Sequence, residues 1–233
     1  MPHRSPWSCV LWDVDGTVVD ASEGILRRLG IAMRHYGHPE VTTAELVHWI
    51  GPPMFETFQK QLGMTPEQAT EAVAFYRTLG KQDGYTTGAR LYPGVGELIA
   101  DLDAAGVPQA TASSKPEVQV VALLEHFALT PHFAAIVGAD EDKNLRSSKA
   151  DVIAEALRRL ERAGVDTSRP VLIGDRHHDV EGGAIHDVPV IFVHWGFSWP
   201  HEAEGAQAAV ATIEELRSLL LIPDADTEGD RDA

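Results

Sequence analysis

Three features that mark common classes of protein are scarce or absent in this chain of 233 residues. Cys9 is its single cysteine, so no internal disulfide is possible, and its place at the head of an apolar stretch predicts a buried, inert thiol. No apolar run approaches the roughly 20 residues that a membrane-spanning helix needs, and residues 1–8 lack the apolar run of a signal peptide. We therefore expect a cytoplasmic protein without a membrane partner.

Cations are scarce as well. Lysine and arginine number 19 against 35 acidic residues, which gives a formal net charge of −16. Such a field repels polyanions, so nucleic acid is not expected as a partner, and a small anionic substrate would need a local positive site or a metal ion. The hydrophobic fraction of 44% supports a globular core, and the length suits one large domain or one domain with an insert.

The segment from Val10 to Thr17 is the first candidate site. Three apolar residues typical of a strand run into Asp13, and Asp15 and Gly16 follow. Because residues two apart in a strand share a face, the two aspartates can reach one crevice, and ligands bind at the carboxyl ends of strands in open parallel sheets. Crowded carboxylates repel each other, so a proton or a cation must lie between them. An ordinary turn at the end of a strand is the alternative.

Residues 21–90 show helical periodicity and little strand signal. Thr42 with Glu45, and Thr65 with Gln68, are typical of capping boxes at helix starts. A connection of about 70 residues is too long for an ordinary crossover between strands, whose loops are short. The segment 21–90 is therefore predicted to be an inserted α-helical cap domain.

From residue 91 the pattern alternates between helices and short apolar strands, as in a parallel sheet with helices on both faces. We predict an α/β fold with a Rossmann-like core formed by residues 1–20 and 91–223, followed by an acidic, frayed tail at 224–233. A capping box at Thr212 and Glu215 starts the last helix. The strands are predicted at residues 10–12, 108–112, 133–137, 171–173 and 188–193.

Further candidate residues follow the later strands. Ser113 and Ser114 lie where a strand gives way to a helix, which suits a phosphate oxygen, although a plain serine cap is the simpler interpretation of Ser113 alone. Lys149 opens a helix, where a cation is disfavoured, so we expect an anion nearby unless the side chain is simply solvated. Asp175 follows three apolar strand residues and Asp179 lies four residues on. Oxygen-only sets of this kind suit Mg²⁺.

Two neighbouring histidines, His177 and His178, lie between these aspartates. Transition-metal binding is one interpretation. Because neighbouring histidines point in different directions, we favour a role in a surface loop.

In order, these pieces resemble the four motifs of the haloacid dehalogenase superfamily of phosphatases, namely Asp13-x-Asp15-Gly16-Thr17, Ser113, Lys149 and Gly174-Asp175-x-x-x-Asp179. The helical insert resembles that superfamily's cap. Gly51-Pro52-Pro53, Tyr92-Pro93-Gly94 and Gly174-Asp175-Arg176-x-His178-Asp179 are most similar to the phosphoglycolate phosphatase-like branch. The dehalogenases proper lack the second aspartate, so Asp15 argues against their chemistry, and Ala150 stands where sugar phosphomutases typically carry a proline.

The resemblance implies a role for each catalytic residue. Asp13 would attack phosphorus and form an aspartyl-phosphate. Asp15 would protonate the leaving oxygen and then activate water. Ser113 and Ser114 would hold phosphoryl oxygens, and Lys149 would neutralise charge on the nucleophile and the phosphate.

Mg²⁺ is the cofactor that the resemblance implies, held by Asp13, Asp15 (through its backbone carbonyl), Asp175 and Asp179. The prediction is a Mg²⁺-dependent phosphatase for a small phosphorylated metabolite. A 5′-nucleotidase, a pyrophosphatase and a phosphomutase are the enzymatic alternatives, and a catalytically silent binding protein is the other. The sequence leaves the oligomeric state open.

Substrate choice is predicted to rest on the cap. The four motifs contact only phosphate, metal and the transferring oxygen, whereas a lid would touch the leaving group and exclude water. Gly51, Pro52 and Arg77 are the candidate specificity residues, although a solvated Arg77 is the simpler interpretation.

Overall fold

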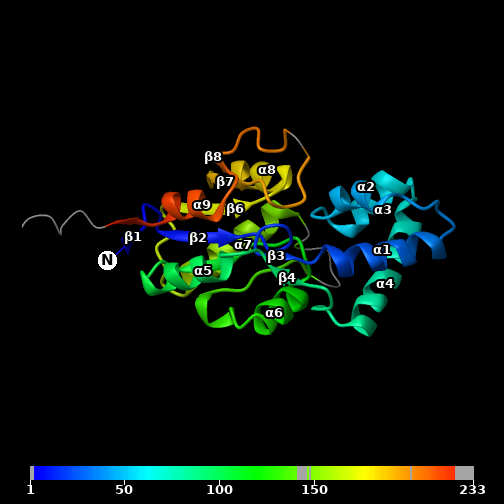
Figure 1. Ribbon diagram of the computed structural model, residues 1–233, viewed down its shortest axis with the longest axis horizontal. Helices are drawn as coiled ribbons and strands as arrows, with labels where there is room; N and C mark the ends of the chain where they lie inside the picture. Colours follow the sequence, from blue (N-terminus) through cyan, green and yellow to red (C-terminus); the bar gives the residue numbers. More distant parts are fainter. Residues whose placement is uncertain (1–2, 141–145, 147, 200, 224–233) are drawn as a thin grey trace, which may run out of the picture.

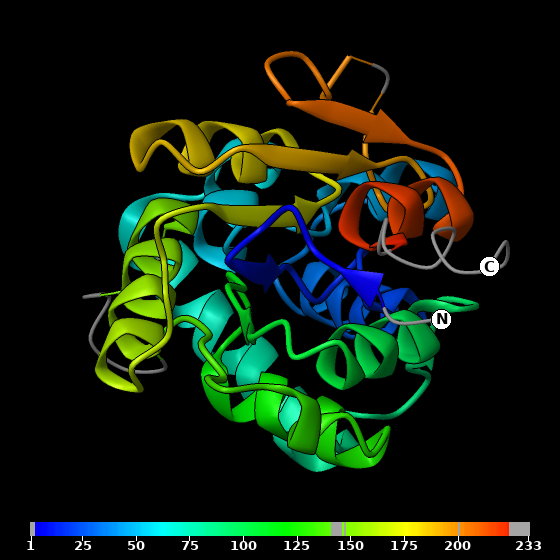
Figure 2. The same cartoon turned by 90° about the vertical axis from the view of Figure 1, so that its left-hand side faces the viewer.

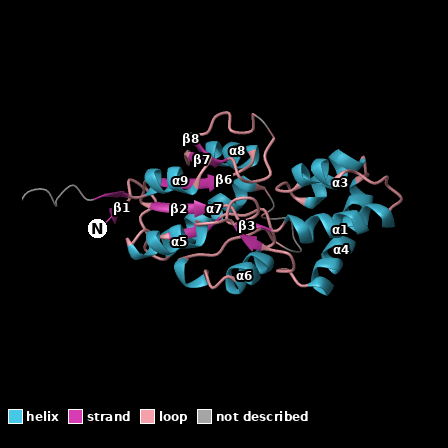
Figure 3. Ribbon diagram, viewed as in Figure 1, coloured by secondary structure: helices cyan, strands magenta, loops and turns pink. Residues whose placement is uncertain are grey.

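The computed structural model describes residues 3–140, 146, 148–199 and 201–223, and it shows a sheet-based core beside a lobe of helices (Figure 1; Figure 3). The strands are β1 (His3–Arg4), β2 (Cys9–Trp12), β3 (Val19–Asp20), β4 (Arg90–Leu91), β5 (Gln109–Thr111), β6 (Pro170–Gly174), β7 (Val190–Val193), β8 (Ala208–Val210) and β9 (Ile222–Pro223). The helices are α1 (Ser22–His35), α2 (Thr43–Leu46), α3 (Met54–Leu62), α4 (Pro66–Asp83), α5 (Val95–Ala104), α6 (Glu117–His126), α7 (Lys149–Arg162), α8 (His177–Ile185) and α9 (Ile213–Leu220), with 3-10 turns at Val47–Trp49 and Thr130–His132.

Five parallel strands form the core sheet in the order β5-β2-β6-β7-β8. This arrangement confirms the predicted α/β fold. Trp12 at the end of β2 lies opposite Thr111 of β5 and Ile173 of β6, so the three strands end together. The residues that follow them therefore meet at one edge of the sheet.

The two faces of the sheet bury alternate residues of each strand. Val10 and Trp12 of β2 pack with α5, α6 and α9, whereas Cys9 and Leu11 pack with α7 and α8. Figure 2 shows the sheet between these two layers of helices. Both faces are covered, which is why the central strands are continuous apolar runs rather than alternating ones.

Helices α1 to α4 surround a hydrophobic cluster of their own, which includes Leu29, Met33, Phe58 and Tyr76. The chain enters this lobe after β3 and leaves it before β4, and these two strands pair antiparallel. Thr65 and Gln68 form the predicted reciprocal capping box, whereas Thr42 is a cap on one side only, accepting the backbone N–H of Glu45. We interpret the lobe as a cap.

Three predictions about elements need comment. Residues 133–137 run beside β5 with a single bridge, Ala110 to Ala135. The N–H of Val137 donates to the Thr111 hydroxyl at 2.7 Å and not to a backbone carbonyl of β5, which interrupts the ladder. The predicted strand is therefore wrong, and the short β8 supplies the fifth strand instead. The tail at 224–233 lies outside the described residues. Among the helices that the structure describes, none is long and apolar enough to cross a membrane.

Candidate active site

Asp13 lies one residue beyond β2 and is buried at the carboxyl edge of the sheet. Lys149, the first residue of α7, donates to Asp13 Oδ1 at 2.5 Å and to the carbonyl of Ala112 at 2.8 Å, and its Nζ lies 2.8 Å from Asp179 Oδ1. Burial alone would lower the pKa of Lys149, but the charges of Asp13 and Asp179 outweigh it and raise the pKa. The anion expected beside this lysine is thus a pair of aspartates.

Three buried carboxylates meet here. One oxygen from each of Asp13, Asp175 and Asp179 lies within 4.8 Å of the others. Burial, with repulsion from the neighbouring carboxylates, raises the pKa of Asp13 and Asp175 above the ordinary value of an aspartate. An oxygen-only donor set that is short of positive charge fits a hard divalent cation such as Mg²⁺.

Asp175 is fixed by the loop that follows β7. Its carboxylate accepts the backbone N–H of Phe197 at 2.7 Å and the hydroxyl of Thr17 at 3.4 Å. A Cβ at Gly16 or at Gly196 would collide with the same carboxylate. Both positions therefore need glycine, and the backbone closes directly around the candidate metal ligand.

Asp15 takes a different place from the one that its spacing suggests. It lies outside the cluster of three carboxylates and pairs with Lys115, Oδ2 to Nζ at 2.6 Å, with side chains only 12% and 6% exposed. Its other oxygen, Oδ1, is buried without a hydrogen-bond partner among the described residues. Sequence reasoning missed Lys115, although a lysine two residues after Ser113 was a signal for a second cation at this edge.

The two serines lie where a strand ends, as predicted, but neither caps a helix. Helix α6 begins at Glu117 with Pro116 as its cap residue, so the interpretation of Ser113 as a cap is wrong. Ser113 is buried, and its hydroxyl accepts the backbone N–H of Lys115 at 3.3 Å. Ser114 lines the neighbouring cavity.

A cavity of about 450 Å³ separates the core from the cap. Core residues Asp15, Ser114 and Lys115 line one part of it, and the remaining wall is mainly apolar. All three predicted specificity residues, Gly51, Pro52 and Arg77, are in that wall. The cap residues of the wall are Ile25, Ile50, Gly51, Pro52, Pro53, Met54, Phe55, Glu56, Thr70, Val73, Ala74, Tyr76 and Arg77.

Direct contacts join the cap to the core beside this cavity. The guanidinium of Arg176, which follows Asp175, donates to the carbonyl of Ile50 and pairs with Glu202 at 2.7 Å. The imidazole of His48 lies 3.0 Å from the carbonyl oxygen of Phe197, the residue whose N–H binds Asp175. The cap is therefore linked to the same loop that fixes a candidate metal ligand.

Comparisons with known proteins identify the family to which this chain belongs. Residues 10–193 match the family described as haloacid dehalogenase-like hydrolase. Tyrosine-protein kinase PtkA of Mycobacterium tuberculosis is 38% identical over 223 residues, covering 94% of this chain and 74% of that protein, and 5′-nucleotidase of Pseudomonas aeruginosa is 34% identical over 213 residues, covering 91% and 94%. The crystal structure of a "predicted phosphatase" from Clostridium acetobutylicum matches with a TM-score of 0.84 and 32% identity, covering 91% of this chain and 97% of that one. The resemblance read from the four motifs is thus confirmed, and the chain belongs to the haloacid dehalogenase-like hydrolase family.

Proposed function

We propose that the chain is a Mg²⁺-dependent phosphatase that hydrolyses a small phosphorylated metabolite through an aspartyl-phosphate on Asp13. The observation that carries the proposal is the buried Asp13 carboxylate, held by Lys149 at 2.5 Å beside two further aspartates at the end of the sheet. A structural role alone does not account for three buried carboxylates of which only Asp13 and Asp179 pair with Lys149, because unpaired buried charge costs several kcal/mol.

The residues divide the chemistry between them. An oxygen of Asp13 forms a bond to phosphorus while the leaving oxygen departs with a proton from Asp15. Asp15 then takes a proton from water, whose oxygen attacks phosphorus and releases phosphate and the Asp13 carboxylate. Lys149 offsets the charge of nucleophile and phosphate, and Mg²⁺ held by Asp13, Asp175 and Asp179 would supply further positive charge at the phosphoryl oxygens.

The cavity favours a bulky, partly apolar leaving group. A volume of about 450 Å³ falls in the range of pockets for drug-sized ligands, and the two-carbon group of phosphoglycolate would leave most of it unfilled. Apolar side chains such as Phe55 and Tyr76 suit the flat face of a base. A nucleoside monophosphate fits these features better than phosphoglycolate or pyrophosphate, and the Pseudomonas aeruginosa relative is named for that activity.

Phosphate release from a panel of substrates tests the proposal. The panel contains p-nitrophenyl phosphate, nucleoside monophosphates, phosphoglycolate, pyrophosphate and hexose phosphates, each with Mg²⁺ and after dialysis against EDTA. We expect Mg²⁺-dependent release, fastest with nucleoside monophosphates, and its loss in Asp13→Asn, where the amide keeps the shape but is a poor nucleophile. Residual rates within tenfold of wild type would remove Asp13 from the role of nucleophile.

Transfer to another acceptor is the competing outcome. The relative PtkA is named a tyrosine-protein kinase, so the same preparation should be offered ATP with a tyrosine peptide. Peptide phosphorylation without net phosphate release would replace hydrolysis with transfer. Conversion of a hexose phosphate to its isomer in the presence of a bisphosphorylated primer would identify a mutase.

A further inference from the structure

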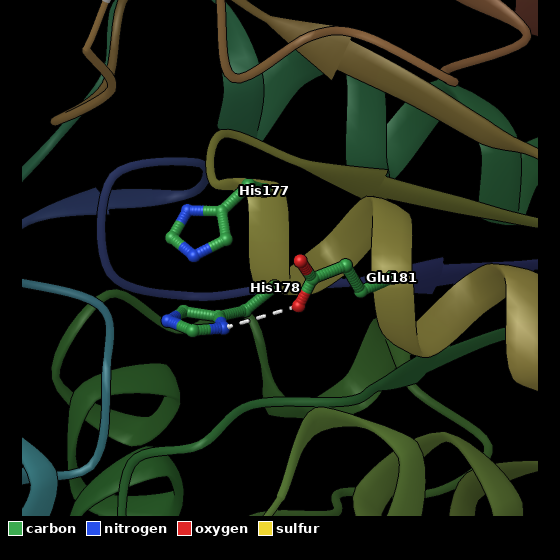
Figure 4. A group of neighbouring side chains, drawn as sticks. All are labelled: His177, His178 and Glu181. Carbon is green, nitrogen blue, oxygen red and sulfur yellow. Dashed lines mark ion pairs between the residues drawn. The ribbon is translucent and has the colours of Figure 1, made fainter.

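A second group of metal-ligating side chains lies at the start of α8, apart from the aspartate cluster. His177, His178 and Glu181 each offer one ligand atom, and these atoms all lie within 4.8 Å of one another (Figure 4). The imidazole rings of His177 and His178 are in contact, with centroids 3.8 Å apart and planes tilted by 40°. The expectation that the two histidines point apart in a surface loop is wrong, because they occupy the first turn of a helix and turn to the same side.

The ring of His177 is already held in one orientation. Its Nδ1 lies 3.2 Å from Glu202 Oε1, and Glu202 is itself held by Arg176 at 2.7 Å. A carboxylate on one ring nitrogen is the arrangement that orients metal-binding histidines and leaves the other nitrogen, here Nε2, for the metal. Glu181 extends from the next turn, with its Oε2 at 3.8 Å from Nδ1 of His178 (Figure 4).

We propose that His177, His178 and Glu181 form a binding site for a transition-metal ion such as Zn²⁺, Co²⁺ or Ni²⁺. Two imidazoles and one carboxylate are ligands that these ions prefer, whereas Mg²⁺ prefers the oxygen-only set of the aspartates. The two sites therefore select different metals. This proposal does not depend on the phosphatase proposal, since the ligands bind whether or not phosphate is hydrolysed.

Electrostatics around the site allow a cation there. The start of a helix carries partial positive charge that disfavours a cation by up to about 1 kcal/mol. Acidic groups oppose that effect: Glu181 is a ligand, and the charges of Glu56 on the cap helix α3 and of Glu181 act on His178. Glu202 contacts His177 but is paired with Arg176, whose positive charge also acts on His178. Glu56 also lines the cavity between core and cap and pairs with Lys60 at 2.8 Å.

Cobalt titration of the EDTA-dialysed full chain, followed by visible absorption and by equilibrium dialysis, tests the site. In the presence of excess Mg²⁺, which occupies the aspartate cluster, we expect a bound Co²⁺ with a spectrum of nitrogen ligation. His177→Ala and His178→Ala should each raise the Kd for Co²⁺ by more than about tenfold, and Glu181→Gln, at an exposed position, should also weaken binding.

Two variants serve as controls. His126→Ala removes an exposed histidine at the end of α6 and should bind Co²⁺ as wild type does. Asp175→Asn alters only the aspartate cluster and should retain the nitrogen-ligated spectrum. The proposal is overturned if the histidine variants, folded by circular dichroism, keep the wild-type Kd and spectrum, or if Asp175→Asn or excess Mg²⁺ abolishes the cobalt signal.

Discussion

Asp175→Asn should make the metal-free protein more stable while it abolishes activity. Lys149 forms ion pairs with Asp13 and Asp179, whereas the described residues contain no such pair for Asp175. The asparagine side chain can still accept the N–H of Phe197 and stay in place of the carboxylate. The variant therefore removes a repelling charge and keeps the hydrogen bond.

The size of the effect follows from the geometry. Two like charges within 4.8 Å of each other repel by about 3 kcal/mol or more at an effective dielectric constant near 20. Asp175 faces two such neighbours, and the hydrogen bond from the Phe197 backbone and the charge of Arg176 offset part of the repulsion. We expect the free energy of unfolding to rise by about 1–3 kcal/mol at neutral pH without metal.

The pH dependence has a definite sign. The native pKa of Asp175 is raised, so the native state favours the protonated carboxyl. The protonated carboxyl therefore stabilises the native state fully below the ordinary aspartate pKa of about 3.9, and this stabilisation is lost as pH rises through the native pKa. The difference between variant and wild type should therefore be largest at neutral pH and small near pH 4. Mg²⁺ should reverse the order, since it stabilises only the protein that binds it.

Urea unfolding followed by circular dichroism measures these differences, in EDTA and in Mg²⁺. Glu125→Gln, at an exposed position on α6, is the matched control and should change little. The reasoning is refuted if Asp175→Asn is less stable than wild type in EDTA at neutral pH with an unchanged m-value.

Three other outcomes are expected. Burial alone would raise the pKa of Glu202, but hydrogen bonds from His177 and Arg176 outweigh it and lower the pKa to about 2. The ionised Glu202 carboxylate should thus stabilise the native state above about pH 4.3, and this stabilisation should be lost as pH falls toward 2. In Glu202→Gln the free energy of unfolding should therefore fall less steeply between about pH 4 and pH 2 than in the wild type. Gly51 has a φ of +114° and an added Cβ would lie 2.9 Å from Arg176, so Gly51→Ala should cost about 1–3 kcal/mol and raise KM, whereas Gly63→Ala, with open space around it, should cost less and leave KM unchanged. Burial raises the pKa of the Cys9 thiol to about 11, so a disulfide reagent should label it only after unfolding; rapid labelling of the native protein would contradict the assignment.

Much of the candidate site was accessible from the sequence because its residues follow strands. Asp13 and Asp175 each end a run of apolar residues, and parallel pairing of β2 with β6 brings them together. Lys149 could be predicted to face an anion because a cation at a helix start is otherwise unfavourable. In each case a short sequence pattern is enough to predict which side chains come together in the fold.

Other features depend on contacts that no local pattern encodes. Lys115 meets Asp15 across 100 residues of sequence, and Phe197 binds Asp175 through its backbone, so its side chain gives no signal. The sequence pattern predicts a loop at His177 and His178, and the helix α8 that begins there gives no separate signal. The strand predicted at 133–137 is interrupted because the N–H of Val137 donates to the Thr111 hydroxyl instead of to a backbone carbonyl of β5.

The paired strands β3 and β4 have a consequence for how this protein can be rebuilt. Val19 lies opposite Leu91 and Asp20 opposite Arg90, so the two chain crossings into the helical lobe are neighbours in one ribbon, about 5 Å apart. A tight turn could join them in place of the whole lobe, and a different insert with adjacent ends could take the same position. We therefore propose that the ribbon makes the lobe a replaceable module, so that exchange of this segment would test whether the same catalytic edge accepts new substrates.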